Sequence, residues 1–203
     1  MESIMTDKYS GFTLIELLIV VAIIAILAAI AVPNFLEAQT RSKVSRVLAD
    51  MRSQATGIEA YAVDHNHYPL YGVVNKSGTL QNPHVTPSGA PAHKFLNECI
   101  TTPIAYISQI FEDPFIITGS EPDPAWRQYW LRYFYTNLDQ FSQVMSPNPP
   151  PVIALKKSIY GTWILTGAGP DKDRLDLARD LPYDPTNGTI SDGDIIRSPR
   201  YNR

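Results

Sequence analysis

Residues 12–32, near the N-terminus, form an apolar stretch in which polar side chains are almost absent. Across residues 12–32 the only polar side chains are those of Thr13 and Glu16. About 20 apolar residues, at about 1.5 Å of rise per residue, make a helix long enough to cross the hydrocarbon core of a bilayer. The pattern therefore predicts a transmembrane helix with one ionisable group. A carboxylate is costly in hydrocarbon, so Glu16 is a candidate functional residue.

The helical pattern continues beyond this apolar stretch but becomes amphipathic. Apolar residues recur at intervals of three and four, with charged residues between them, which predicts that residues 34–63 turn one face toward a core. Pro33 lies between the two halves and removes a backbone hydrogen bond, so we expect a kink there. Residues 64–69 combine Asp, Asn and Pro and predict the end of the helix. The recurring apolar residues are Val44, Val47, Leu48, Met51, Ala55, Ile58 and Ala62.

The remainder of the chain predicts short strands in a loop-rich domain. Residues 129–136 and 159–166 are dense in aromatic and β-branched side chains, which favour strands, and residues 152–155 are a third candidate. Residues 94–100 predict a short helix, and residues 71–92 a surface loop rich in Gly, Pro, Ser and Asn. The predicted fold class is therefore α+β, with a long N-terminal helix packed on a small antiparallel β-sheet and a loop-rich C-terminal segment.

Composition narrows the possible functions. The formal net charge is −3, whereas a nucleic-acid-binding protein usually carries a basic patch or an excess of basic residues. The single cysteine excludes an intramolecular disulfide. The sequence contains no nucleophile elbow, phosphate-binding loop or zinc-ligand spacing, so we do not expect an enzyme.

Residues 11–16 read Gly-Phe-Thr-Leu-Ile-Glu, and together with the apolar run that follows they resemble the class III signal of type IV pilins and type II secretion pseudopilins. The resemblance implies the pilin fold. It also implies that a prepilin peptidase cleaves after Gly11 and that the new N-terminus at Phe12 is methylated. Glu16, the fifth residue of the mature chain, would then guide assembly into a homo-oligomeric helical filament.

Elementary electrostatics supports this role for Glu16. Cleavage creates an α-amino group at Phe12, inside or at the edge of the apolar phase. A buried amine and a buried carboxylate each cost several kcal/mol alone and partly offset each other when they pair. We therefore expect Glu16 of one subunit to pair with the Phe12 amine of a neighbour and to set the axial register, as a buried polar group does in a coiled coil.

The resemblance also implies a domain organisation and a location. Residues 1–11 would be the leader, 12–33 the transmembrane and assembly half of the helix, 34–63 its amphipathic half, and 64–203 a periplasmic globular domain. The protein would cross the bacterial inner membrane once. Its partners would be the prepilin peptidase, an inner-membrane assembly platform and minor pseudopilins. The basic side chains beyond the span favour the opposite orientation by the positive-inside rule, so the orientation comes from the resemblance.

The C-terminal part is rich in closely spaced Asp, Asn and Gly, which can aim several oxygens at one Ca²⁺ ion. Residues 166–171 resemble the calcium loop of major pseudopilins, although Lys172 stands where that loop usually has a glycine. Solvated Asx-turns are the alternative explanation of the same residues. The candidate ligands are Asp171 and Asp173, then Asp184, Asp192 or Asp194, with main-chain carbonyls near Leu165.

These features favour a structural filament subunit, and three alternatives remain open. Many type IV pilins close a C-terminal loop with a disulfide, so the single cysteine favours a type II secretion pseudopilus over a type IV pilus. A secreted or membrane-anchored Ca²⁺-dependent binding module is an alternative of another class. Residues 29–31 read Ala-Ile-Ala and could form an ordinary secretory cleavage site, which would give a mature chain that starts at Val32.

Overall fold

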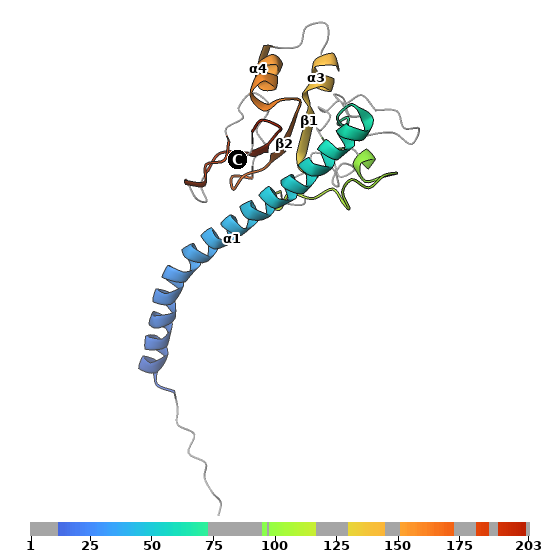
Figure 1. Ribbon diagram of the computed structural model, residues 1–203. Helices are drawn as coiled ribbons and strands as arrows, with labels where there is room; N and C mark the ends of the chain where they lie inside the picture. The colour runs from blue at the N-terminus through green and yellow to red at the C-terminus, as the bar shows by residue number, and fades with distance from the viewer. Residues whose placement is uncertain are drawn as a thin grey trace, which may run out of the picture. The chain divides into compact units, whose positions relative to one another are not determined.

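The computed structural model describes residues 12–72, 95–96, 98–116, 130–144, 151–172, 182–186 and 191–201 (Figure 1). The chain divides into two compact units, Met1–Gln39 and Thr40–Arg203. Helices and a small sheet together confirm the α+β class. In chain order the elements are α1 (Leu14–His65), the 3₁₀ helix η1 (Glu98–Ile100), β1 (Phe134–Asn137), α3 (Leu138–Val144), α4 (Pro151–Tyr160), β2 (Trp163–Gly167) and β3 (Ile195–Arg197).

The long N-terminal helix predicted from the sequence is confirmed as α1. The prediction that its two halves differ in polarity is also confirmed. Its first half is apolar and exposed, and among the described residues it alone is long and apolar enough to cross a membrane. Its second half buries one face, which includes Val47, Met51 and Ile58. The helix continues through Pro33, and the kink there stays a prediction. Asn66 follows the last helical residue with φ of 56°, the left-handed conformation in which helices commonly end.

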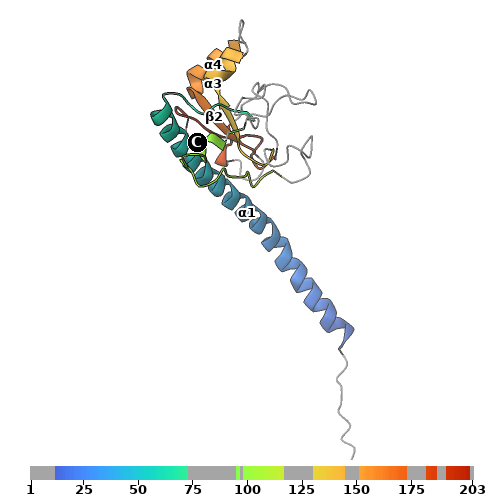
Figure 2. The ribbon, with the colours of Figure 1, turned by 90° about the vertical axis from the view of Figure 1, so that its right-hand side faces the viewer.

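The sheet has three antiparallel strands in the order β1-β2-β3. The sequence-based prediction of a small antiparallel sheet is thus confirmed. Leu165, in the central strand β2, pairs with Tyr135 of β1 and Arg197 of β3. The main core is formed where residues of α1 and the sheet pack together, and it includes Ile58, Tyr135 and Leu165. These three side chains are fully buried. The sheet therefore lies against the second half of α1 (Figures 1 and 2).

The candidate strand at residues 152–155 is wrong, because this segment belongs to helix α4. Pro151 occupies the first position of that helix, where its fixed φ suits a helix and its missing N–H costs nothing. Ile153, Lys156 and Tyr160 recur at helical spacing and form the buried face. A short run of apolar residues is compatible with either a strand or a helix. Here the burial of one face at helical spacing identifies the segment as a helix.

The boundaries of the other elements also differ from those predicted. The strand predicted at 159–166 starts only at Trp163, because Gly161 ends α4 with φ of 94°. The strand predicted at 129–136 begins at Phe134; residue 129 lies outside the described residues. The short helix predicted at 94–100 is the 3₁₀ turn η1, and most of the loop at 71–92 lies outside the described residues. Strand β3 was not predicted at all.

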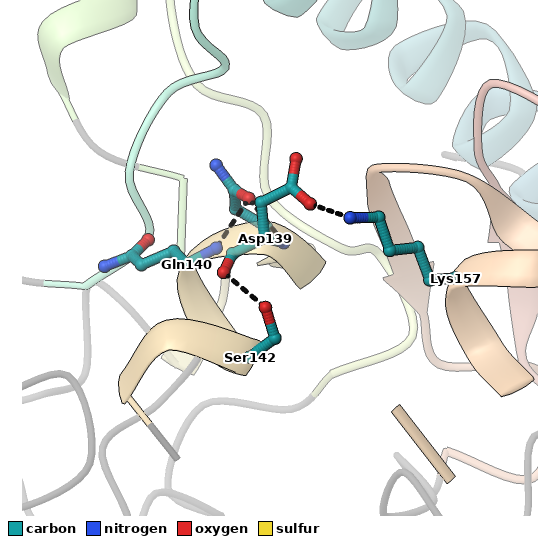
Figure 3. A network of polar contacts seen from close by, with 5 residues as sticks. Asp139, Gln140, Ser142 and Lys157 are labelled. Atoms are coloured by element: carbon teal, nitrogen blue, oxygen red, sulfur yellow. Dashed lines mark hydrogen bonds and ion pairs between the residues drawn. The ribbon is translucent and has the colours of Figure 1, made fainter. Parts of the chain in front are cut away.

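A buried polar network ties the segment after α1 to the start of α3. Asn137 caps α3, since its Oδ1 accepts hydrogen bonds from the backbone N–H groups of Asp139 (3.0 Å) and Gln140 (3.1 Å). The Gln140 amide accepts from the N–H of Tyr71 (2.8 Å) and donates to its carbonyl (3.3 Å). Asp139 forms an ion pair with Lys157 of α4 (Figure 3). These contacts connect α3 to both of its neighbours.

One core position of α1 is polar. Gln54 is 1% exposed, and neither its Nε2 nor its Oε1 has a hydrogen-bond partner among the residues that the structure describes. A buried amide without a partner costs about 1–3 kcal/mol, whereas an apolar side chain of similar shape avoids that penalty. We expect Gln54→Met to raise the free energy of unfolding of a fragment of residues 40–203 by about 1–2 kcal/mol, measured by urea denaturation.

The control for this variant is Ala60→Met, which places the same side chain on the exposed face of α1. Its effect should stay within about 0.5 kcal/mol. A loss of stability in Gln54→Met would show that the amide has a partner in the folded protein.

Candidate functional site

The first turn of α1 holds its own carboxylate in a capping box. Glu16 Oε2 accepts hydrogen bonds from the Thr13 N–H (2.9 Å) and the Thr13 hydroxyl (2.7 Å). In return Thr13 Oγ1 accepts from the Glu16 N–H at 3.3 Å. Thr13 is the N-cap and Glu16 is at the third helical position, the spacing at which this reciprocal pair satisfies two backbone donors of a helix start.

Thr13 is the functional residue that the sequence reasoning missed. The signal was present, because Thr-x-x-Glu directly before an apolar run is the sequence signature of a capping box. The structure adds that Glu16 has a partner within its own chain. The Glu16 carboxylate is therefore already oriented at the helix N-terminus.

The apolar residues around this cap are exposed. Within the described part of their own unit, no segment covers them. Phe12 is 73% exposed, and the large apolar side chains of residues 14–36 are 46–80% exposed. An exposed apolar surface of this extent marks contact with a membrane or with other proteins. Gly11, the predicted cleavage position, lies outside the described residues.

The segments that the sequence predicts to bind Ca²⁺ approach each other closely at two glycines. A Cβ placed on Gly169 would lie 2.1 Å from the Gly193 carbonyl oxygen and 3.3 Å from Asp171 Oδ1. A Cβ on Gly193 would lie 2.5 Å from the Pro182 carbonyl oxygen. The main chains of three segments thus approach closely at this point, and they bring along Asp171 and the buried Asp194.

The other candidate ligands are placed differently. Asp184 Oδ1 accepts hydrogen bonds from the N–H (2.8 Å) and hydroxyl (2.7 Å) of Thr186, and these bonds lower the pKa of the Asp184 carboxyl. Asp192 is exposed, and Leu165 is fully buried in the central strand. Asp173 lies outside the described residues. Within the described part of the chain, no three His, Cys, Asp or Glu side chains are grouped closely enough to hold a metal ion.

Comparison with known proteins gives matches to the N-terminal region. Residues 6–32 match the family model described as the prokaryotic N-terminal methylation motif. The chain is 34% identical over 64 residues to the type II secretion system core protein G of Escherichia coli (strain K12), a match that covers 32% of this chain and 44% of that protein. No solved structure matches the chain.

Type IV pilus proteins match the same region. The chain is 50% identical over 58 residues to the type IV major pilin protein PilA of Myxococcus xanthus (strain DK1622), covering 29% of this chain and 26% of that pilin. It is 52% identical over 58 residues to the type IV wide pilus major component PilA4 of Thermus thermophilus, covering 29% and 44%. The chain thus spans less than half the length of each of these three relatives.

The matches and the geometry describe the same feature. The methylation motif ends within the apolar half of α1, and it contains the Thr13–Glu16 cap and the exposed apolar surface that follows. Both groups of relatives are named as pilins or secretion core proteins, and both match through a short part of the chain. The chain therefore carries a prokaryotic N-terminal methylation motif, and its N-terminal region is similar to type IV pilins and to type II secretion core proteins.

Proposed function

We propose that this protein is a filament subunit of the type II secretion pseudopilus. The observation that carries the proposal is a capped carboxylate, Glu16, four residues after the new N-terminus that cleavage after Gly11 would create, at the start of a helix whose apolar side chains are exposed. Relatives in both secretion and pilus systems support a structural filament subunit. The single cysteine favours the secretion system, since it leaves no intramolecular disulfide.

The proposed mechanism follows from the chemistry of the helix start. The precursor is stored in the inner membrane through the apolar half of α1, with its globular unit in the periplasm. A prepilin peptidase removes residues 1–11 and exposes the Phe12 amine, which is then methylated. In the filament Glu16 pairs with that amine on a neighbour, and the exposed apolar side chains pack against other copies instead of lipid. An inner-membrane platform and minor pseudopilins would complete the machine.

Mass spectrometry of the mature N-terminus in the native host tests this assignment. We expect a chain that starts at methylated Phe12, because the peptidase and the methylation act on the motif that contains it. An unmodified start at Val32 would show secretory cleavage and would exclude the filament function.

Deletion of the gene distinguishes the two filament systems. A pseudopilus subunit is needed for export, so the deletion strain should retain exported proteins in the periplasm while surface filaments remain. Loss of surface filaments with normal export would instead assign the chain to a type IV pilus. Complementation with the intact gene is the control.

We also propose that Ca²⁺ stabilises the C-terminal part of the globular unit. The residues fit in part: the close approach at Gly169 and Gly193 brings the segments of Asp171 and Asp194 together, and these carboxylates, with Asp173, would hold the ion. Carboxylate and main-chain oxygens are the ligands that Ca²⁺ prefers. The bound ion would link segments that have few apolar residues of their own.

Removal of Ca²⁺ should therefore lower the melting temperature of the 40–203 fragment. An ion present at 100 times its dissociation constant stabilises the folded state by about 2.7 kcal/mol, which corresponds to roughly 5–10 °C for a domain of this size. Differential scanning calorimetry in Ca²⁺ and in chelator measures the effect, with Mg²⁺ as the control. Superimposable curves would exclude the ion.

A further inference from the structure

Helix α4 presents apolar side chains to solvent. Val152 is 40% exposed, Leu155 59% and Ile159 48%. They follow one another at spacings of three and four and so form one stripe along the helix, beside the buried face. We call these three residues the α4 stripe. The one charged side chain on the buried face, Lys156, is 5% exposed, so this helix buries a lysine while it exposes apolar residues.

A groove of about 860 Å³ lies elsewhere on the same unit, between the first turns of its α1 segment and the C-terminal segments. Its lining is mostly apolar and includes the side chains of two tyrosines. We call it the α1 groove. Its lining residues are Arg41, Val44, Ser45, Leu48, Pro182, Tyr183, Asp184, Pro185, Thr186 and Tyr201.

The α4 stripe and the α1 side of the groove lie at opposite ends of the globular unit, whereas Tyr201 on the C-terminal side of the groove packs against Tyr160 at the end of α4, with ring centroids 5.7 Å apart. Both ribbon views place α3 and α4 at one end of the unit and the first turns of its α1 segment at the other (Figures 1 and 2). The stripe and the groove are separate surfaces of one folded unit, so the stripe cannot enter the groove of its own chain. Between copies they make a head-to-tail contact, which is heterologous and continues indefinitely, as a helical filament requires.

The size of the stripe also fits a second copy of this chain. Three half-exposed side chains offer much less than the roughly 800 Å² per partner of a stable complex, so the contact is weak between free subunits. In a filament the packed apolar helices would hold neighbouring globular units at a high effective concentration, where a weak contact becomes occupied. Subunits stored in the membrane would thus not polymerise through this contact alone.

We propose that the α4 stripe of one subunit docks into the α1 groove of another and forms the contact between globular units along the filament. The inference rests on the proposed filament function and adds the surfaces that the globular units use. The groove residues Val44, Leu48 and Tyr183 would receive Val152, Leu155 and Ile159.

Cysteine cross-linking in assembled filaments of the full chain tests the contact. The parent is Cys99→Ser, to which Leu155→Cys and Ser45→Cys are added together; both positions are exposed, so the fold should tolerate them. A short bis-maleimide should join the double variant into a ladder of dimers, trimers and higher species. Each single variant alone should stay monomeric, and the two single variants co-expressed should give dimers only.

The outcomes separate this inference from the function on which it rests. Filaments that assemble normally but give no adducts would overturn the stripe-to-groove contact and leave the filament function in place. Dimers from Leu155→Cys alone would also overturn it, because they indicate a symmetric contact between two stripes. If the parent makes no filaments and its N-terminus is not methylated at Phe12, the filament function fails and this inference with it.

A charge on the stripe provides a second test. Leu155→Asp should lower the amount of sedimentable filament at least about tenfold, with leader removal unchanged, because the docked position would bury an unpaired charge. Ala154→Asp is the matched control, since Ala154 is exposed on another face of the same helix. Equal filament yields from the two variants would overturn the proposal.

Discussion

Replacing Glu16 with glutamine is expected to abolish filament assembly while leader removal continues. Glutamine can still accept a hydrogen bond at the third position of the helix, so the cap with Thr13 is kept and only the negative charge is lost. Without that charge, the Phe12 amine of the neighbouring subunit would be buried without its partner. Such a loss costs about 3–5 kcal/mol at each contact, which corresponds to a decrease of at least about 100-fold in assembly.

Thr13→Ala is the matched control, because it keeps the charge of Glu16 and removes the cap. The loss of an N-cap costs about 0.5–2 kcal/mol, so assembly should be weakened much less than in Glu16→Gln. Mass spectrometry reports leader removal, and sedimentation of sheared filaments reports assembly. A normal filament yield from Glu16→Gln would show that capping, rather than charge pairing, is the role of Glu16.

Gly169→Ala is expected to destabilise the globular unit by about 3 kcal/mol or more. The added methyl group would lie 2.1 Å from the carbonyl oxygen of Gly193. That atom belongs to the main chain and cannot rotate away as a side chain can. The segment after β2 would therefore separate from the segment before β3, and the free energy of unfolding of the 40–203 fragment in urea measures the loss.

Gly167→Ala, two residues earlier, is the control. Its methyl group would lie 2.9 Å from Cε of Met51, the end of a flexible side chain, and 3.1 Å from a ring atom of Tyr133. Because Met51 can move, the loss should be clearly smaller than for Gly169→Ala. Equal stability of Gly169→Ala and the parent would mean that the two segments do not pack together in solution.

The features that the sequence predicts correctly depend on local patterns. An uninterrupted apolar run predicts the first half of α1, and the spacing of Val47, Met51 and Ile58 predicts the buried face of its second half. The stop signal at residues 64–69 matches the end of the helix at His65. Each of these signals repeats at a spacing of a few residues, so no distant contact is needed to interpret it.

The errors occur where short segments depend on distant partners. The sequence of residues 152–155 favours a strand. The segment is nevertheless helical, because the side chains of Ile153 and Lys156 are buried against the rest of the globular unit. Strand β3 forms in a polar segment because Ile195 and Ile196 pair with β2. The Thr13–Glu16 cap is the exception, because its Thr-x-x-Glu signal is local and the prediction for Glu16 used only the charge of that residue.

The sequence by itself determined that this chain has a long apolar helix with a carboxylate near its start, because that information is contained in consecutive residues. Only the tertiary structure decided which face of α4 stays exposed, where the α1 groove lies, and which segments meet at Gly169 and Gly193. Those properties depend on how segments far apart in the chain pack together. The order of polar and apolar residues along the chain does not encode them in any short window.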